Sequence, residues 1–521
     1  MEPASEHVLA GGRSGGAAYG LTGWPPSVWE VEDVARRARP VRLEKQALEN
    51  VERARAALGD CLRGGAAIYG VNTGFGSLSR QRLGDDQLTA VQHNLIRSHA
   101  AGMGDPLPEA VVRAMLFLLA CSLSRGNSGV RAEVVELIVG MLNAGVTPIV
   151  PETGSVGASG DLAPLAHCAL VMLGEGEASL EGVRMGGGEA LRKAGLSAIA
   201  LGPKEGLALV NGTHLMAGRG ALSVCEARRL MDAALVAAAM SIDGARATDR
   251  TLDPRLHAAR NQPGQRRVAD RLRALLRNSA IVNVHKVDDP RVQDPYSFRC
   301  TPQVVGAAWD MIEHAVEVIS NELGAVTDNP LVFAADEEYE RADVISGGNF
   351  HGMPVALALD ALSMSLAHVA GMSERRVYYL LAAADPENPT NPHLSRHPGV
   401  ESGLMMMQYT AAACCNELIG LANPASVANI PTCAGMEDYN SFGPRSAAKA
   451  ERAVELARRV VAIELVCAAE AIEYQRPLRS GTGVERAHRL IRELVAPFDA
   501  DRPTGAEAEK VAALIQAGRF G

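Results

Sequence analysis

Five long stretches of helical apolar spacing constrain the fold of this chain more than any other feature. In each stretch, apolar residues recur at i, i+3 and i+4, the spacing that covers one face of an α-helix. The stretches are residues 219–247, 302–323, 354–382, 405–421 and 446–474. Several exceed twenty residues, and alternating strand-like runs are scarce, so we expect a mainly α fold built around a long central helical bundle.

The rest of the chain is predicted to divide around this bundle. Residues 1–28 are expected to form a disordered tail, because their first twenty are rich in Gly, Ala and Ser and contain no apolar run. Residues 29–217 then form an N-terminal domain of helices and loops, residues 218–480 the central bundle, and residues 481–521 a small C-terminal helical cap. Two loops are candidates for mobile segments: the acidic stretch 334–343 and the proline-rich stretch 385–399.

Charge and composition exclude several classes of protein. The net charge is −9 and the basic residues are scattered, which argues against a nucleic-acid surface. The most apolar segment, 353–372, contains Asp360 and His368 at amphipathic spacing, so we expect a buried helix rather than a membrane span. No secretory signal is evident, which favours a cytoplasmic location. The nine cysteines form no CxxC pair, and no two histidines flank a glutamate at metal-binding spacing, so no metal is expected.

The segment GSVGASGDLAPLAH, residues 154–167, carries the most specific chemistry. In a tight turn, the amide nitrogen of Gly160 can attack the carbonyl carbon of Ala158. Loss of two waters then leaves a five-membered ring with an exocyclic methylene derived from Ser159, and that ring is an electrophile. Glycine suits the attacking position because a Cβ would block the close backbone approach. The ordinary alternative is that Ser159 or Asp161 only caps a helix over residues 162–173.

This segment resembles the cofactor-forming loop of the aromatic amino acid ammonia-lyase and aminomutase family. Further motifs follow in the family's chain order from about Tyr69 to about Tyr474, and they are most similar to the histidine-specific members. The resemblance implies a 4-methylideneimidazol-5-one group made from Ala158, Ser159 and Gly160. It also implies a homotetramer whose active sites borrow residues from three chains.

The same resemblance assigns functional roles to several further residues. The ordinary explanations are a loop anchor for Tyr69, a turn residue for Asn211 and a structural ion pair for Arg299. Tyr69, in YGVNTGFG, corresponds to a base or proton shuttle. Asn211, in LALVNGTH, corresponds to a residue that binds the prosthetic ring or the substrate amine. Gln293, Tyr296 and Arg299 lie within seven residues, and Arg299 is suited to a bidentate contact with an amino acid carboxylate.

Four further positions correspond to residues around the substrate ring or the prosthetic group. His99 follows Arg97-Ser98 and offers a hydrogen bond that a plain phenyl ring cannot use. Met405 corresponds to a residue beside that ring, and Phe350 is either core packing or a face against the prosthetic group. Glu437, in GMEDYNSFG, decides the substrate class, because a carboxylate can pair with an imidazole but gains nothing from a phenyl ring.

The expected reaction is therefore elimination of ammonia from an aromatic L-amino acid, with L-histidine giving trans-urocanate as the leading assignment. Either Tyr69 or Glu437 would remove the β-proton. A tyrosine ammonia-lyase or tyrosine 2,3-aminomutase is the alternative, because such enzymes share the Arg-Ser-His sequence. Met436, Glu401 and the segment 388–392 depart from the histidine-specific pattern. An inactive helical scaffold is the alternative from another class, and the intact Ala-Ser-Gly loop argues against it.

Overall fold

The chain divides into two compact units. The computed structural model describes residues 17–63, 68, 70–73, 84, 87–284, 291–386 and 388–521. The first unit comprises the residues up to Gly218 together with Asn321–His351 and Pro431–Asn440. The second unit comprises Arg219–Ser320, Gly352–Ile430 and Ser441–Gly521.

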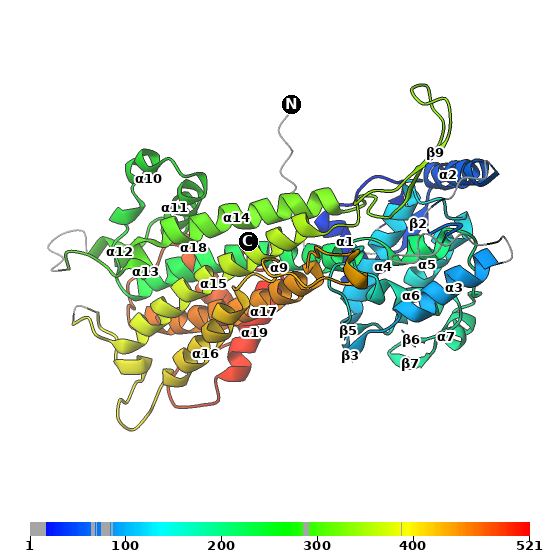
Figure 1. Cartoon of the computed structure of the whole chain (residues 1–521). Helices are drawn as coiled ribbons and strands as arrows, with labels where there is room; N and C mark the ends of the chain where they lie inside the picture. The colour runs from blue at the N-terminus through cyan, green and yellow to red at the C-terminus, as the bar shows by residue number, and fades with distance from the viewer. Residues whose placement is uncertain are drawn as a thin grey trace. The chain divides into compact units, whose positions relative to one another are not determined.

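Helices dominate both units (Figure 1), which confirms the predicted mainly α fold. The α-helices of the described residues are α1 Val28–Arg36, α2 Lys45–Arg63, α3 Leu88–His99, α4 Glu109–Ser124, α5 Ala132–Ala144, α6 Ala163–Met172, α7 Gly187–Lys193, α8 Glu205–Val210, α9 His214–Gly244, α10 Pro254–Arg260, α11 Pro263–Leu275, α12 Ala280–Val284, α13 Tyr296–Arg299, α14 Thr301–Glu322, α15 Met353–Ala382, α16 Met405–Leu421, α17 Gly443–Glu473, α18 Thr482–Arg492 and α19 Gly505–Gln516. Short 3-10 turns occur at η3 Arg250–Leu252, η4 Pro392–Leu394 and η5 Cys433–Gly435.

The strands are short and form small sheets. They are β1 Tyr19–Leu21, β2 Val41–Leu43, β3 Met103–Pro106, β4 Thr147–Pro148, β5 Pro151–Thr153, β6 Glu177–Leu180, β7 Val183–Gly186, β8 Leu331–Phe333 and β9 Asp343–Ile345. Strand β1 pairs with β2 in parallel, whereas β3 with β5, β4 with β6, β6 with β7, and β8 with β9 pair antiparallel. Strands β6 and β7 form a hairpin, with Leu180 opposite Val183 at its turn.

Helix α4 is the centre of the first unit. Nearly all of its residues are buried, and α1 and α5 pack against it. Its buried Arg113 donates hydrogen bonds to the carbonyl groups of Val34 and Ala35 at the end of α1, and to that of Leu142 near the end of α5. These contacts satisfy carbonyls that have no partner within their own helices. Arg113 thereby ties three helices together through their ends.

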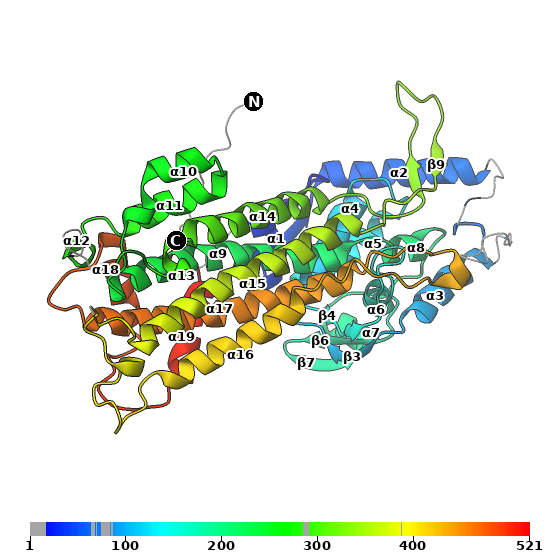
Figure 2. The ribbon, with the colours of Figure 1, turned by 60° about the vertical axis from the view of Figure 1, so that its left-hand side comes forward.

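A hairpin from later in the chain completes this unit. Strands β8 and β9 pack on α2, where Val332 joins a buried cluster with Leu58, Ile68 and Val71. The loop between the two strands stands out beside α2 in both views (Figures 1 and 2). The first unit is thus built from segments more than 100 residues apart in sequence.

The second unit is built on long helices that run side by side (Figure 2). Helix α15 packs against α16 and α17, and α17 packs against α19. Among the described residues, α15 is the one helix long and apolar enough to cross a membrane. Two thirds of that apolar window is buried inside the fold (67%), which is how the core helix of a soluble protein behaves.

A buried ion pair lies inside this bundle. Arg376 of α15 donates to Glu464 of α17 at 2.5 Å, and both side chains are almost fully excluded from solvent. The hydroxyl groups of Ser241 and Ser373 also donate to Glu464. Two buried charges are tolerated here because each is paired and hydrogen-bonded.

Candidate active site

The Ala158-Ser159-Gly160 loop adopts a bent backbone that few residues accept. Ser159 has a φ of 50° and Gly160 a φ of 84°, both in the left-handed region. Leu162 follows with a φ of 36°, at the N-cap of α6. Ala158 and Gly160 are buried and Ser159 is partly exposed. Successive residues with positive φ are costly, and such strain is typical of functional loops.

Gly212 holds this loop from the other side. The N–H of Asp161 donates to the carbonyl of Gly212 at 2.8 Å, and the N–H of Gly212 donates to the carbonyl of Ser159 at 3.2 Å. A Cβ on Gly160 would lie 2.1 Å from the Gly212 oxygen. Glycine is therefore required at position 160 both for its φ and for this close contact.

Two buried titratable groups lie beside the loop. The Oδ2 atom of Asp161 accepts from the N–H of Leu215 at 2.6 Å, and no described residue bonds its other oxygen. Burial raises the pKa of Asp161 to about 8. Burial also lowers the pKa of His214 to about 3, and neither of its ring nitrogens has a hydrogen-bond partner in the described part of the chain. Asp161 is therefore largely protonated, and His214 is neutral, at pH 7.

Asn211 lies at the end of α8, directly before Gly212. Its backbone N–H and its side-chain amide both donate to the carbonyl of Leu207 at 3.1 Å. The residue is buried at 3% exposure. The position thus agrees with the ordinary role of Asn at a helix end, and it also brings the side chain next to the glycine that supports the loop.

His99 ends α3, and the residues after it contact the loop segment. The N–H of Gly102 donates to Nε2 of His167 on α6 at 3.1 Å. A Cβ on Gly154 would lie 2.9 Å from the Cα of Gly102, so the two backbones are in close contact. The structure therefore brings the end of α3 against the start of the Ala-Ser-Gly segment.

The ring of His99 is neutral at physiological pH and oriented. Burial lowers its pKa below the usual value, although nearby Glu437 partly opposes the shift. The hydroxyl of Ser98 donates to the carbonyl of Leu95 at 3.1 Å, and Nδ1 of His99 lies 3.0 Å from that hydroxyl oxygen. Because the hydroxyl proton is already used, Nδ1 must be the donor, which leaves Nε2 as an acceptor.

Glu437 is held by a chain of hydrogen bonds from its own turn. The Thr432 hydroxyl donates to Oε2 of Glu437 at 2.7 Å, and the side-chain nitrogen of Asn440 lies 3.3 Å from the Thr432 oxygen. The same nitrogen lies 3.4 Å from the backbone carbonyl of Glu437, so it must be the donating NH₂ group. The Thr432 hydroxyl accepts from Asn440 and directs its only proton to Glu437. No described residue bonds Oε1 of Glu437, which leaves this oxygen available to a ligand.

Asn329 organises the segment that leads to Phe350. Its side-chain oxygen accepts from the N–H of Gly347 at 2.7 Å, and its nitrogen donates to the Ser346 hydroxyl at 3.2 Å. Phe350 is partly exposed rather than packed in the core.

The second unit carries the predicted carboxylate-binding motif. Gln293 and Tyr296 are exposed, and the Arg299 guanidinium lies over the Tyr296 ring at 4.5 Å from its centroid. The Nε atom of Arg299 is buried and has no hydrogen-bond partner among the described residues. No salt bridge of Arg299 occurs within the described part of the chain. Stacking on the Tyr296 ring orients the Arg299 guanidinium.

Met405 begins α16 in the same unit and is partly exposed. The turn before it is held by Asp501, which accepts from the N–H groups of Ser402 and Gly403 at 2.8 and 2.9 Å. Glu401 accepts from the Ser395 hydroxyl at 3.3 Å. Glu401 therefore has a local structural partner.

The structure brings together one group of predicted residues in the first unit. This group contains the Ala158–Gly160 loop, Asn211, His99 and Glu437, with the contacts given above, and Phe350 belongs to the same unit. Gln293, Tyr296, Arg299 and Met405 belong to the second unit. Tyr69 lies outside the described residues.

Several residues that the motifs did not reveal also support the site. They include Thr432, Thr327, Lys204 and Asp328, whose partners lie near the predicted residues in space. Thr327 and Asp328 lie in the segment TDNPLVF, but the sequence does not show that their partners are Thr213 and Lys204. The role of Thr432 depends on side-chain geometry within its own turn. Among the described residues, no cluster of three or more His, Cys, Asp or Glu side chains could hold a metal ion.

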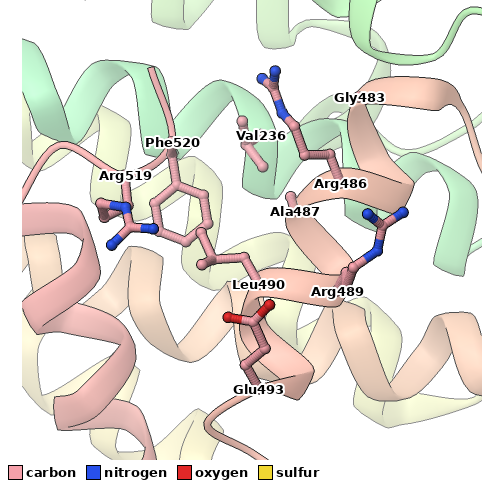
Figure 3. A pocket seen from close by; sticks show the side chains of 9 residues that line it. All are labelled: Val236, Gly483, Arg486, Ala487, Arg489, Leu490, Glu493, Arg519 and Phe520. Carbon is pink, nitrogen blue, oxygen red and sulfur yellow. The ribbon is translucent and has the colours of Figure 1, made fainter. Parts of the chain in front are cut away.

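A cavity of about 250 Å³ in the second unit is not a competing site. Figure 3 shows its lining, in which the side chains of Arg486, Arg489 and Arg519 point in different directions rather than toward one centre. All three are exposed, and none of the predicted residues lines the cavity. The bent loop of the first unit therefore remains the candidate active site.

Comparison with known proteins shows the family to which the chain is related. A family model described as aromatic amino acid lyase matches residues 27–493. The histidine ammonia-lyase of Sorangium cellulosum is 46% identical over 501 residues, which cover 96% of this chain and 97% of that protein.

Solved structures show the same relationship. The histidine ammonia-lyase from Trypanosoma cruzi has a TM-score of 0.88 at 37% identity, and the alignment covers 96% of this chain and 94% of that one. The tyrosine aminomutase from Streptomyces globisporus has a TM-score of 0.89 at 30% identity, with 97% and 98% covered.

The helical fold, the bent loop and these relatives define a carbon–nitrogen lyase. The chain belongs to the aromatic amino acid lyase family, whose model covers most of its length.

Proposed function

We propose that this chain eliminates ammonia from L-histidine to give trans-urocanate. The observation that carries the substrate assignment is Glu437, held as a hydrogen-bond acceptor by Thr432 and lying within electrostatic range of His99. The similarity to proteins named histidine ammonia-lyase supports the same assignment.

The electrophile is proposed to form from Ala158, Ser159 and Gly160. The nitrogen of Gly160 adds to the carbonyl carbon of Ala158, and that carbonyl oxygen leaves as one water with the hydrogens of the Gly160 and Ser159 amide nitrogens. The Ser159 hydroxyl and the hydrogen on its Cα leave as the second. The positive φ of Ser159 and Gly160, and the lack of room for a Cβ at Gly160, fit a tripeptide bent for this closure. The resulting 4-methylideneimidazol-5-one supplies a carbon electrophile that allows the substrate amine to leave.

The ring of the substrate is proposed to lie between His99 and Glu437. In a protonated imidazole, which has two ring N–H groups, Nε2 of His99 accepts a hydrogen bond from one and Oε1 of Glu437 accepts from the other. A phenyl ring offers neither donor, and it would leave the Glu437 carboxylate desolvated without compensation. The arrangement therefore favours imidazole over phenyl.

Other residues are proposed to hold the amino acid backbone. Arg299 binds the substrate carboxylate, for which its stacked guanidinium is oriented, while Gln293 and Tyr296 border this position. Asn211 binds the amine or the prosthetic group, and Phe350 and Met405 contact the rings. Either Tyr69 or Glu437 removes the β-proton while Arg299 keeps the geometry of elimination.

We propose that the working enzyme is a cytoplasmic homotetramer whose active sites combine residues from several chains. Its partner is the small amino acid substrate, and neither nucleic acid nor membrane takes part. Residues from the two units need not come from the same copy of the chain.

The proposal is tested with purified protein and separate solutions of L-histidine, L-tyrosine and L-phenylalanine. Ultraviolet absorbance follows the conjugated acid, an ammonia assay follows release, and chromatography follows any β-amino acid. We expect one ammonia and one urocanate per histidine consumed, with much slower turnover of phenylalanine. Absence of urocanate would reject the substrate assignment.

A tyrosine ammonia-lyase or 2,3-aminomutase is the second candidate. It is favoured by the Arg97-Ser98-His99 sequence, since Nε2 of His99 could equally accept from a phenol, and by similarity to a tyrosine aminomutase structure. The same assay separates these outcomes. Coumarate from tyrosine indicates a tyrosine lyase, whereas β-tyrosine without net ammonia indicates an aminomutase.

A further inference from the structure

Lys204 occupies a position that is unfavourable for a lysine in two ways. Its side chain is fully excluded from solvent, and its φ of 75° lies in the left-handed region. Lysines are rarely buried completely, and residues with a Cβ rarely adopt this φ. Where such a combination persists, the surrounding structure must compensate for it, and it is often found at functional sites.

The compensation comes from Asp328. The Nζ atom of Lys204 donates to Oδ2 of Asp328 at 2.5 Å, and the aspartate is 2% exposed. The second oxygen of Asp328 accepts from the N–H of Asn329 at 2.6 Å. Both carboxylate oxygens of Asp328 are therefore hydrogen-bonded, and the ion pair joins segments 124 residues apart in sequence.

Thr327, the neighbour of Asp328, contacts the chain at the other end of α8. Its Oγ1 atom accepts from the N–H of Thr213 at 3.3 Å. Residues 327 and 328 thus contact both Lys204, at the start of α8, and Thr213, just beyond its end. We call these two contacts the α8 clamp.

The segment held by the α8 clamp contains Gly212, the residue that supports the Ala-Ser-Gly loop. Gly212 lies one residue before Thr213, and it makes both backbone hydrogen bonds to the Ser159–Asp161 stretch. A Cβ on Gly212 would lie 2.6 Å from Thr327 Oγ1, so Thr327 packs directly against this glycine. Any shift of α8 along its axis would move Gly212 and release the bend at Gly160.

We infer that the α8 clamp, formed by Lys204, Asp328 and Thr327, is a positioning device for closure of the Ala158–Gly160 ring. The inference rests on the proposed function and concerns residues that do not touch substrate. Fixing Gly212 keeps the Gly160 nitrogen and the Ala158 carbonyl carbon in the bent arrangement that ring closure needs. The clamp contributes through geometry and takes no part in the bond changes.

A paired substitution separates this role from simple stabilisation. Lys204→Met alone would leave Asp328 charged, buried and unpaired, and such a chain can fail to fold. Lys204→Met with Asp328→Asn removes both charges, keeps the side-chain sizes and leaves an oxygen to accept from Asn329. The control is Lys193→Met, which breaks an exposed ion pair to Glu189 of 2.8 Å in the same unit.

The readout is the intact mass of the full-length protein, measured together with its circular dichroism and its activity on L-histidine. Wild type and Lys193→Met are expected to weigh two waters less than their sequences. We expect the double variant to fold, but with most molecules at the full sequence mass and with activity reduced in the same proportion. Complete water loss and full activity in the folded double variant would overturn the inference.

A second pair of variants decides the question should the double variant not fold. Thr327→Val removes the acceptor for Thr213 at nearly constant shape, whereas Thr327→Ser keeps it. We expect slower loss of water in Thr327→Val and wild-type behaviour in Thr327→Ser. Equal and complete maturation of both would overturn the inference. A wild-type chain at full sequence mass would instead reject the proposed function, and this inference with it.

Discussion

Gly160 is the residue on which the geometry of the loop depends most. Its φ of 84° disfavours any residue with a side chain, and a Cβ at this position would lie only 2.1 Å from the Gly212 oxygen. The neighbouring Ser159 already has a positive φ, so a change in its backbone torsion angles could not relieve strain at Gly160.

Gly160→Ala is therefore expected to prevent ring closure and to destabilise the loop. The Cβ must displace the Gly212 backbone, which breaks the two hydrogen bonds that hold the bend. Intact mass should show a chain without water loss, and thermal unfolding should show a lower midpoint. Gly145→Ala, at a φ of 75° with no atom within 4 Å of its Cβ, is the control for strain alone. Full maturation of Gly160→Ala would contradict the geometry described.

Thr432 is expected to determine how well Glu437 recognises substrate. Thr432→Val removes the hydrogen bond to a charged group while nearly preserving shape, and we expect kcat/KM for L-histidine to fall about tenfold. Thr432→Ser keeps the hydroxyl and should restore most of the activity. Steady-state kinetics on both variants provide the measurement. Equal kinetics for Val and Ser at this position would show that the hydroxyl has no such role.

The sequence alone pointed to residues whose chemistry is local. Ala158, Ser159 and Gly160 are adjacent, so the possible ring could be recognised without knowing the fold. Lys204 and Asp328 could not be paired in this way, because hydrophobic spacing contains no information about contacts over such a separation. The role of Thr432 likewise depends on the direction of a single hydroxyl proton, which only the positions of Asn440 and Glu437 determine.

At the scale of elements, the junction of α17 and α18 is held by ionised side chains. Glu473 accepts from His488 at 2.9 Å and from Nε of Arg492 at 2.9 Å. The hydrogen bond from His488, together with the positive charge of Arg492, lowers the pKa of Glu473 to about 2 despite its partial burial.

This junction predicts a pH-dependent contribution to stability. The folded pKa of Glu473 lies below the unfolded value, so its contribution is present above the usual carboxylate pKa and is lost as pH falls toward about 2. Glu473→Gln should lower the free energy of unfolding at pH 7 by about 1.5–3 kcal/mol. Denaturant unfolding at a series of pH values is the measurement.

The control is Glu509→Gln, which removes an exposed ion pair to Arg459 and should cost less than about 1 kcal/mol. For Glu473→Gln, the difference from wild type should shrink steadily as the solution is acidified. A difference that stayed constant down to about pH 3, well below the usual carboxylate pKa, would indicate that the charge of Glu473 is not the cause.

Helical spacing predicted the extents of the long helices well, but it did not predict which elements pack against one another. The five predicted stretches correspond to α9, α14, α15, α16 and α17, with ends that differ by only a few residues. Periodicity reports which face of a helix is apolar but not which helix covers it. It therefore gave no indication that Asn321–His351 and Pro431–Asn440 belong to the first unit.

At the scale of the whole molecule, an exposed apolar stripe supports the proposed homotetramer. Leu357, Met364 and Tyr378 on α15 are 55%, 40% and 54% exposed, at separations of whole heptads that keep them on one helix face. Large apolar side chains exposed along one helix face are typical of a surface that another protein chain covers.

The oligomer can be tested by light scattering coupled to size exclusion. We expect a mass four times the 54.8 kDa of one chain. Met364→Glu should shift the protein toward smaller species and reduce activity, because a charge would be buried at the interface. Lys45→Glu, on the exposed side of α2, is a control that should leave the mass unchanged. A fully active monomer would contradict shared active sites.

The most direct test of the central claim is the rate at which Ser159→Ala converts L-histidine, compared with wild type. Without the serine hydroxyl, the second water cannot be lost and the methylidene carbon cannot form. We therefore predict a fall in kcat of about a thousandfold or more in a protein that remains folded. Retention of full activity by Ser159→Ala would contradict the account.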